Sequence, residues 1–183
     1  MSAALTPALR HIATPPRTCY IPPTISTQGF PPNMRKLSLA LAFAALLCIP
    51  AAAQDAAVMA TVQHFVDAFN KGDTKTAILL CTVEAHIIDE FPPFQWHGAG
   101  ACAKWSADYD HDARKNAITG GVVTLGSPRH VDIVRDRAYV VVPADYAYKQ
   151  NGKPMKETAS LLTVVLRKTA GGWHIAAWSW SKN

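Results

Sequence analysis

Apolar residues recur every three or four positions in the first strongly patterned stretch of the chain, which is the spacing of one helix face. These residues are Val58, Val62, Phe65, Val66 and Phe69. We expect Gly72 to end this helix, because glycine is unfavourable inside a helix and common just after one. Asp73 is a good cap for a second, short helix from Thr74 to about Cys81.

A short strand and a third helix are predicted next. The strand runs from Ala85 to Phe91, and Pro92-Pro93 ends it because proline cannot continue a hydrogen-bonded ladder. The helix runs from Gly98 to about Asn116 and carries Trp105 and Tyr109 four positions apart, on one face.

From residue 118 onward the pattern is that of strands separated by turn residues. The predicted strands are Ile118–Leu125, Arg129–Val134, Ala138–Lys149, Glu157–Lys168 and Trp173–Ser181. The first two are either one long strand with a bulge or two separate strands. Pro143 predicts a kink or an edge position, and Asn151-Gly152 is the strongest hairpin signal in the chain. This order predicts an α+β fold, with three helices packed on one face of a curved, mostly antiparallel sheet.

Residues 34–53 have the three-part layout of a secretory signal peptide. A short basic stretch is followed by an apolar run of 13 residues, Leu37 to Ile49, and then by three alanines before Gln54. The run is short for a membrane span, so we predict export to the periplasm or the exterior, with no membrane association after cleavage. Residues 1–33 are either a mis-assigned start or a disordered extension.

The remaining residues, 54–183, suffice for one domain with its own core. Fourteen basic and thirteen acidic residues give this part a net charge of +1, against +5 for the whole chain. With no basic run, this balance predicts no nucleic-acid partner. Cys81 and Cys102 either form a disulfide, as an oxidising compartment would allow, or remain as buried thiols.

Four stretches carry a family resemblance: HFVDAFNKGD (His64–Asp73), AHIIDEF (Ala85–Phe91), WHG (Trp96–Gly98) opening a helix, and LLTVVLRKTAGGWHIAAWSW (Leu161–Trp180). Together they resemble the nuclear-transport-factor-2-like superfamily, which includes ketosteroid isomerase and the SnoaL-like polyketide cyclases. The resemblance covers residues 54–183. It implies a cone-shaped α+β barrel with a cavity between sheet and helices, and a sheet face that pairs two subunits into a homodimer.

Asp89 is the main candidate site residue. By the resemblance, it stands where the isomerases place their general-base aspartate. The isomerases' oxyanion-hole tyrosine would fall at about Phe65, which has no hydroxyl, and no acid lies near Leu162–Val164, where the second donor is expected. On an inward strand face shared with Ile87, the Asp89 carboxylate would have a raised pKa. Three roles remain open: hydrogen bonding at the Pro92–Gly98 corner, ligand binding and acid–base catalysis.

Aromatic residues supply most of the predicted pocket. Its predicted lining is Phe65, Ile87, Asp89, Trp96, Trp105, Tyr109, Tyr146 and Trp178. Trp96 and the rings of the third helix could equally pack in the core. Tyr146 with Tyr148, and Trp178 with Trp180, either line the pocket or form a dimer patch. Glu90 is expected to face solvent.

The six histidines after residue 54 show no metal-ligand spacing, and no phosphate-binding loop is present, so we predict no metal site and no cofactor. The preferred interpretation is an exported domain that binds a small apolar molecule. One alternative is an enzyme of the SnoaL or isomerase type with Asp89 as general base. Another is a non-catalytic assembly domain that dimerises through its sheet.

Overall fold

The computed structural model describes residues 51–183, so the predictions for residues 1–33 and for most of the signal peptide lie outside the described part. The helices are α2 (Ala51–Asn70), α3 (Thr74–Leu79) and α4 (Ala101–Lys115). The strands are β1 (Cys81–Ile88), β2 (Gln95–Ala99), β3 (Ile118–Leu125), β4 (His130–Val134), β5 (Arg137–Gln150), β6 (Lys153–Thr169) and β7 (Gly172–Ser181). Within residues 51–183, no helix is long and apolar enough to cross a membrane.

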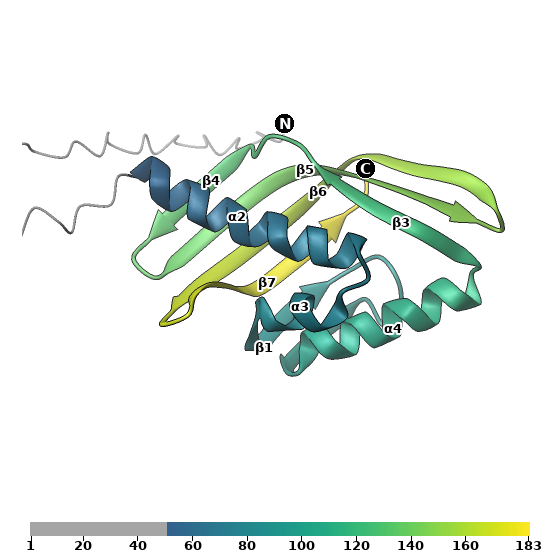
Figure 1. Cartoon of the computed structure of the whole chain (residues 1–183), viewed down its shortest axis with the longest axis horizontal. Helices are drawn as coiled ribbons and strands as arrows, with labels where there is room; N and C mark the ends of the chain where they lie inside the picture. Colours follow the sequence, from purple (N-terminus) through teal and green to yellow (C-terminus); the bar gives the residue numbers. More distant parts are fainter. Residues whose placement is uncertain (1–50) are drawn as a thin grey trace, which may run out of the picture. The chain divides into compact units, whose positions relative to one another are not determined.

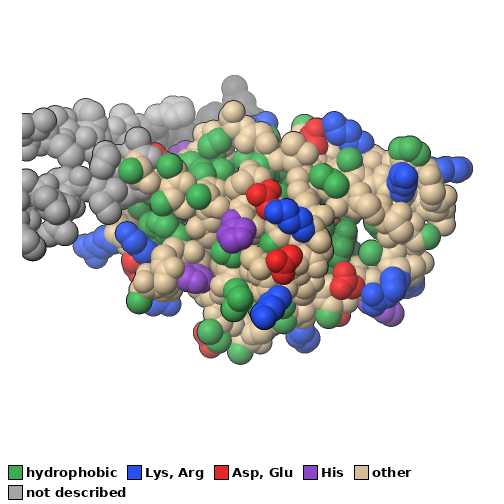
Figure 2. Space-filling view, in the orientation of Figure 1, with side chains coloured by type: hydrophobic (Ala, Val, Ile, Leu, Met, Phe, Trp, Pro, Cys, Tyr) green, Lys and Arg blue, Asp and Glu red, His purple; other side chains and the backbone are tan. Residues whose placement is uncertain are grey.

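The strands form one sheet in the order β2-β1-β7-β6-β5-β3, and β4 also pairs with β5. All pairs are antiparallel except β1 with β7. Helix α2 lies over the sheet, and α3 and α4 lie on the same side of it (Figure 1). The predicted α+β class, with three helices on a mostly antiparallel sheet, is confirmed. Acidic and basic side chains are interspersed on the face that Figure 2 shows.

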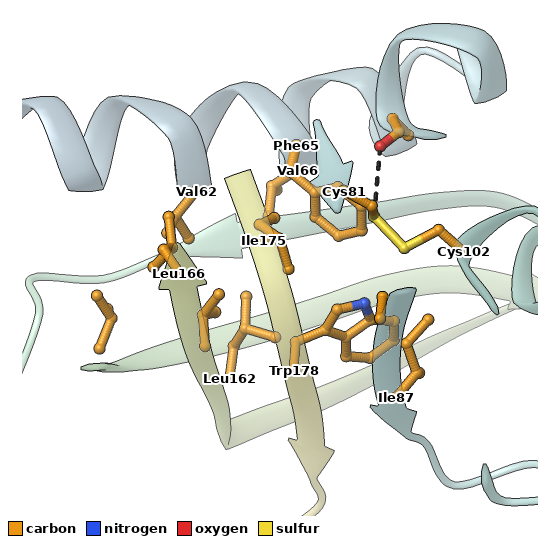
Figure 3. Packing of buried hydrophobic residues seen from close by; sticks show 14 of the residues in the cluster. Val62, Phe65, Val66, Cys81, Ile87, Cys102, Leu162, Leu166, Ile175 and Trp178 are labelled. Carbon is orange, nitrogen blue, oxygen red and sulfur yellow. Dashed lines mark hydrogen bonds between the residues drawn. A yellow bond between two sulfur atoms is a disulfide. The ribbon is translucent and has the colours of Figure 1, made fainter. Parts of the chain in front are cut away.

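The core lies between α2 and the inner face of β5, β6 and β7. Val62, Phe65 and Val66 of α2 point toward the sheet (Figure 3), as the helical spacing predicts. Leu166 of β6 and Ile175 of β7 receive them and are at most 1% exposed. Burial of each such side chain contributes about 1.5 to 3 kcal/mol, so this layer fixes how α2 sits on the sheet.

The region around β1 differs from the sequence-based expectation. Strand β1 begins at Cys81, not Ala85, and ends at Ile88, so Asp89 lies just beyond it. The WHG motif does not open a helix. It belongs to β2, whose Trp96 and His97 pair with Ile87 and His86 of β1. The reason is that the chain reverses direction after Ile88, where the N–H of Asp89 donates a hydrogen bond to Phe94 O at 3.2 Å. Strands β1 and β2 therefore form a hairpin before α4.

Ile118–Leu125 and His130–Val134 are two separate strands, and both pair with β5. Pro143 lies between the stretches of β5 that pair with β3 and with β4, so it withholds no N–H from either ladder. Strand β5 pairs with β6 on one side and with β3 and β4 on the other, so it is an interior strand and the predicted edge position is wrong. The predicted hairpin at Asn151-Gly152 is present, with φ of 50° and 76° at the two turn residues.

Strand β6 changes which of its residues face inward at a bulge. Ala144 of β5 pairs with Ser160, but Tyr146, two positions on, pairs with Glu157, three positions back along β6. Ala159 takes up the extra residue with φ of 59°, and its N–H donates to Asp145 Oδ1 at 3.1 Å. Because side chains alternate along a strand, the bulge turns Glu157 to the same face as Ser160.

The structure joins Cys81, at the start of β1, to Cys102, in the first turn of α4, with an S–S distance of 2.07 Å (Figure 3). The bond closes a loop of 21 residues and ties α4 to the sheet. A loop of this length corresponds to about 3 kcal/mol of stabilisation. Of the two alternatives for these cysteines, the structure has the disulfide.

Candidate functional site

A cavity of about 120 Å³ lies between the helices and the sheet. Its wall is formed by helices α2 and α4, by the segment after β1, and by strands β3, β5, β6 and β7. Its lining comprises Phe65, Val66, Phe69, Asp89, Glu90, Phe91, Trp105, Tyr109, Asp112, Ala113, Ile118, Val123, Tyr146, Tyr148, Glu157, Leu162, Trp178 and Trp180.

Six of the eight predicted pocket residues line this cavity. They are Phe65, Asp89, Trp105, Tyr109, Tyr146 and Trp178. Ile87 and Trp96 do not, and are 0% and 3% exposed in the core. They pair with each other across β1 and β2, and the Trp96 indole donates to Asp108 Oδ2 at 2.8 Å. The prediction failed for these two residues because the cavity opens beyond the end of β1, past Ile87.

Asp89 is fixed by two hydrogen bonds. Its Oδ1 accepts from Glu90 N and its Oδ2 from Trp105 Nε1, each at 2.8 Å. Burial raises the pKa of this carboxyl, the two hydrogen bonds oppose that rise, and the negative charge of Glu157 adds to it. Asp89 is therefore a desolvated carboxylate held in one orientation.

Two tyrosine hydroxyls meet in the cavity. Tyr109 Oη on α4 and Tyr146 Oη on β5 are 2.6 Å apart. Burial raises the pKa of both phenols, so both remain protonated at neutral pH. One hydroxyl donates to the other, and the second proton remains available to a ligand oxygen. A hydroxyl donor is therefore present in the cavity, although not at Phe65, where the isomerase resemblance places one.

The bulge of β3 makes room for this pair. Gly120 has φ of 64°, and the β3–β5 register shifts between Thr119 and Val122. A Cβ on the next residue, Gly121, would lie 2.5 Å from Tyr146 Oη and 3.1 Å from Tyr109 Oη. Gly121 is therefore required for the close approach of the strand to the two hydroxyls.

An ion-pair cluster borders the same cavity. Lys182 Nζ lies 2.7 Å from Glu157 Oε1 and 3.3 Å from Glu90 Oε2. The Glu157 side chain is 7% exposed, and no described residue hydrogen-bonds to its Oε2. Burial, followed by the charge of Glu157, raises the pKa of Glu90, although Lys182 opposes the rise. Within residues 51–183, no three His, Cys, Asp or Glu side chains form a group that could hold a metal ion.

Sequence reasoning missed Glu157. The inward residues Leu162, Val164 and Leu166 extrapolate to even-numbered positions along β6, whereas the bulge at Ala159 reverses this alternation. No glycine marks the bulge, so the sequence holds no signal that could have revealed it. Glu90, expected to face solvent, is indeed an exposed residue, and it lies at the cavity rim with its side chain 32% exposed.

Aromatic rings form much of the remaining wall. Tyr146 stacks on Tyr148 with ring centroids 4.8 Å apart, and Trp180 lies 6.4 Å from Tyr146. Trp105 and Trp178 meet edge to face at 4.8 Å. Of the two alternatives for the strand aromatics, the structure places all four, Tyr146, Tyr148, Trp178 and Trp180, in the cavity lining.

Comparison with solved structures finds the same fold in bacterial proteins. A ketosteroid isomerase-like protein from Erwinia carotovora atroseptica is 20% identical, with a TM-score of 0.56 over 69% of this chain and 94% of that one. A nuclear-transport-factor-2-like superfamily protein from Salmonella enterica is 14% identical, with a TM-score of 0.62 over 73% and 93%. A protein with a cystatin-like fold from Novosphingobium aromaticivorans is 17% identical, with a TM-score of 0.57 over 81% and 91%.

No curated protein matches the chain significantly. A family model does: the model of the SnoaL-like domain matches residues 58–182, from the first buried turn of α2 to the residue after β7. The match and the solved structures agree with the fold described above. The chain therefore belongs to the SnoaL-like domain family, within the nuclear-transport-factor-2-like superfamily.

Proposed function

We propose that the protein is an exported binding domain for a small, largely apolar molecule. The observation that carries this proposal is the cavity itself, in which aromatic rings surround a few fixed polar groups: Asp89, Glu157 and the Tyr109–Tyr146 hydroxyl pair. Such a combination is typical of small-molecule sites. A volume of about 120 Å³ corresponds to a ligand of about one ring.

Export is supported by two separate features. Residues 34–53 have the layout of a signal peptide, and Cys81 and Cys102 are joined in a disulfide, a bond that persists in oxidising compartments. Expression of the full chain in a bacterium, followed by fractionation and N-terminal sequencing, tests the proposal. We expect periplasmic or secreted protein that begins near Gln54. Cytoplasmic protein with an uncut N-terminus would contradict it.

Binding is tested by filling the cavity. Ala113 lines the cavity from α4, so Ala113→Phe would place a ring in the ligand's space, whereas Ala107 is exposed on the same helix. The probes are benzyl alcohol, cyclohexanone and phenol, and the readout is the indole N–H resonances of Trp105 and Trp178. We expect saturable shifts that Ala113→Phe abolishes and the control Ala107→Phe retains. No binding by any probe, or equal binding by both variants, would contradict the proposal.

Acid–base catalysis is the second candidate function. The specific observation is a half-buried Asp89 with a raised pKa in the same cavity as the Tyr109–Tyr146 pair, which can donate to an oxygen that gains charge. Proton NMR in deuterium oxide would detect exchange at the carbon next to the carbonyl of cyclohexanone. Asp89→Asn should abolish this exchange, and Asp110→Asn, at an exposed position of α4, should not. Equal exchange in both variants would remove this candidate.

We also propose that the sheet pairs with a second copy of the chain. Ile88 and Tyr139 lie on the sheet face opposite the helices and are 57% and 44% exposed. Sedimentation velocity should show a dimer that Tyr139→Lys dissociates. Leu79→Lys, on the helix side, should leave it intact. A monomeric wild-type protein would contradict this assignment.

A further inference from the structure

We infer that the ligand of this cavity is a small organic cation, an ammonium group carried on a single ring or a short apolar chain. This inference rests on the proposed binding function and specifies its ligand class. It follows from three features of the cavity wall: its charge, a buried carboxylate oxygen without a donor, and the rings beside it.

The charge of the wall is negative. Its acidic groups are Asp89, Glu90, Asp112 and Glu157, and no Lys, Arg or His is among the described residues that line it. Lys182 reaches the acids from the end of β7 and forms ion pairs with Glu90 and Glu157 only. The wall thus carries four carboxyls, and one ammonium group beside it pairs with two of them. An anionic ligand would therefore be repelled.

Glu157 indicates where a cationic group of the ligand would bind. Its side chain is only 7% exposed; Oε1 accepts from Lys182, and Oε2 has no hydrogen-bond partner among residues 51–183. A buried carboxylate oxygen without a donor is unfavourable, because it has lost water and gained nothing in exchange. A ligand N–H or a methylated ammonium beside Oε2 would supply the partner that this oxygen lacks.

The rings beside Glu157 suit the same group. Tyr146 lies directly opposite Glu157 across β5 and β6 and stacks on Tyr148, and Trp180 is 6.4 Å from Tyr146. Ring faces attract cations, most strongly where water is excluded. The structure thus combines carboxylates with aromatic faces, and a cation on an apolar body satisfies both.

Affinity should also depend on pH in a defined direction. The titratable groups that face the site are Asp89, Glu90, Asp112, Glu157, Tyr109, Tyr146, Tyr148 and Lys182. Burial raises the pKa of Asp89 and Glu90, and a bound cation favours their ionised forms. Affinity for a permanently charged cation should therefore rise as the pH increases through these pKa values, while affinity for a neutral probe should change little.

The test is calorimetric titration of the full-length protein with four probes of similar size: benzyltrimethylammonium, benzylamine, benzyl alcohol and benzoate. We expect the two cations to bind about tenfold or more tightly than benzyl alcohol at pH 7, and benzoate not to bind. Glu157→Gln should reduce the preference for cations over benzyl alcohol to less than about threefold. Glu84→Gln, at an exposed position of β1, is the matched control and should leave the preference unchanged.

The outcomes separate this inference from the function on which it rests. If benzyl alcohol binds as tightly as benzylamine, or benzoate binds best, the cation assignment is overturned while the binding function stands. If none of the four probes binds, both are overturned. The wild-type series and its pH dependence need no variant, so they test the cation assignment even if the Glu157→Gln protein fails to fold.

Discussion

The two halves of the β5–β6 pair differ in what they present to the helices. In the first half, the inward residues are Val140, Val142, Val164 and Leu166, all at most 1% exposed. In the second half, beyond the bulge at Ala159, they are Tyr146, Tyr148 and Glu157, which line the cavity. Both halves use the same backbone ladder. One extra residue in β6 thus separates a stretch that stabilises the fold from a stretch that carries the chemistry.

The two halves also differ in how they satisfy polar groups. The first half has one inward polar side chain, the fully buried Ser160, and is otherwise apolar, so its stability is mainly that of apolar packing. The second half contains the phenols of Tyr146 and Tyr148, whose pKa values burial raises, and the buried carboxyl of Glu157. We therefore expect substitutions in the first half to change mainly stability, and those in the second to change mainly binding.

The largest effect is expected in the first half. Leu166 is fully buried beneath α2, so Leu166→Ala should lower the free energy of unfolding by about 2 to 5 kcal/mol. Tyr148→Phe, in the second half, should lower it by less than about 1 kcal/mol. Urea denaturation of both variants measures the difference, and similar losses would remove the distinction between the halves.

A smaller effect is expected from closing the space that β3 leaves for the tyrosine pair. In Gly121→Ala the new methyl group would lie 2.5 Å from Tyr146 Oη, so the ring must move, with a loss of about 1 to 3 kcal/mol. In the control Gly126→Ala the nearest atom is 3.5 Å away, an ordinary contact. Thermal unfolding compares the two variants. Equal melting temperatures would contradict the close approach.

The smallest effect is a gain in stability. Ala159 has φ of 59°, a conformation that is unfavourable for residues with a side chain and free of strain for glycine. Ala159→Gly should therefore stabilise the protein by about 0.5 to 1 kcal/mol. Ala144→Gly, in the unbulged strand opposite, should destabilise it. A loss in the Ala159 variant would argue against the bulge.

Local signals explain how much of the fold was predictable. Asp73 and Asn151-Gly152 carry their structural role in their own chemistry, so the α3 cap and the β5–β6 turn follow from sequence. Strand β2 does not follow from sequence, because its five residues of mixed polarity, between a proline turn and a helix, show no strand-like alternation of polar and apolar residues.

The candidate site was predictable only where it lies on regular elements. Trp105 and Tyr109 follow from the face of one helix, and Asp89 from its place at the end of a strand. Glu157 and the meeting of Tyr109 with Tyr146 depend on bulges and on packing between elements distant in sequence. Alternation along a single strand holds no information about either.

The central claim is that the cavity desolvates the two carboxyls of the segment after β1, Asp89 and Glu90. Carboxyl-carbon NMR of the protein across a pH titration tests it most directly, with Asp89→Asn to assign the signal. We predict that Asp89 and Glu90 titrate above 3.8 and 4.5, their ordinary pKa values, and that Asp73 and Asp145, whose pKa values hydrogen bonds lower, titrate below 3.8. Titration of Asp89 together with or below Asp73 and Asp145 would contradict the account.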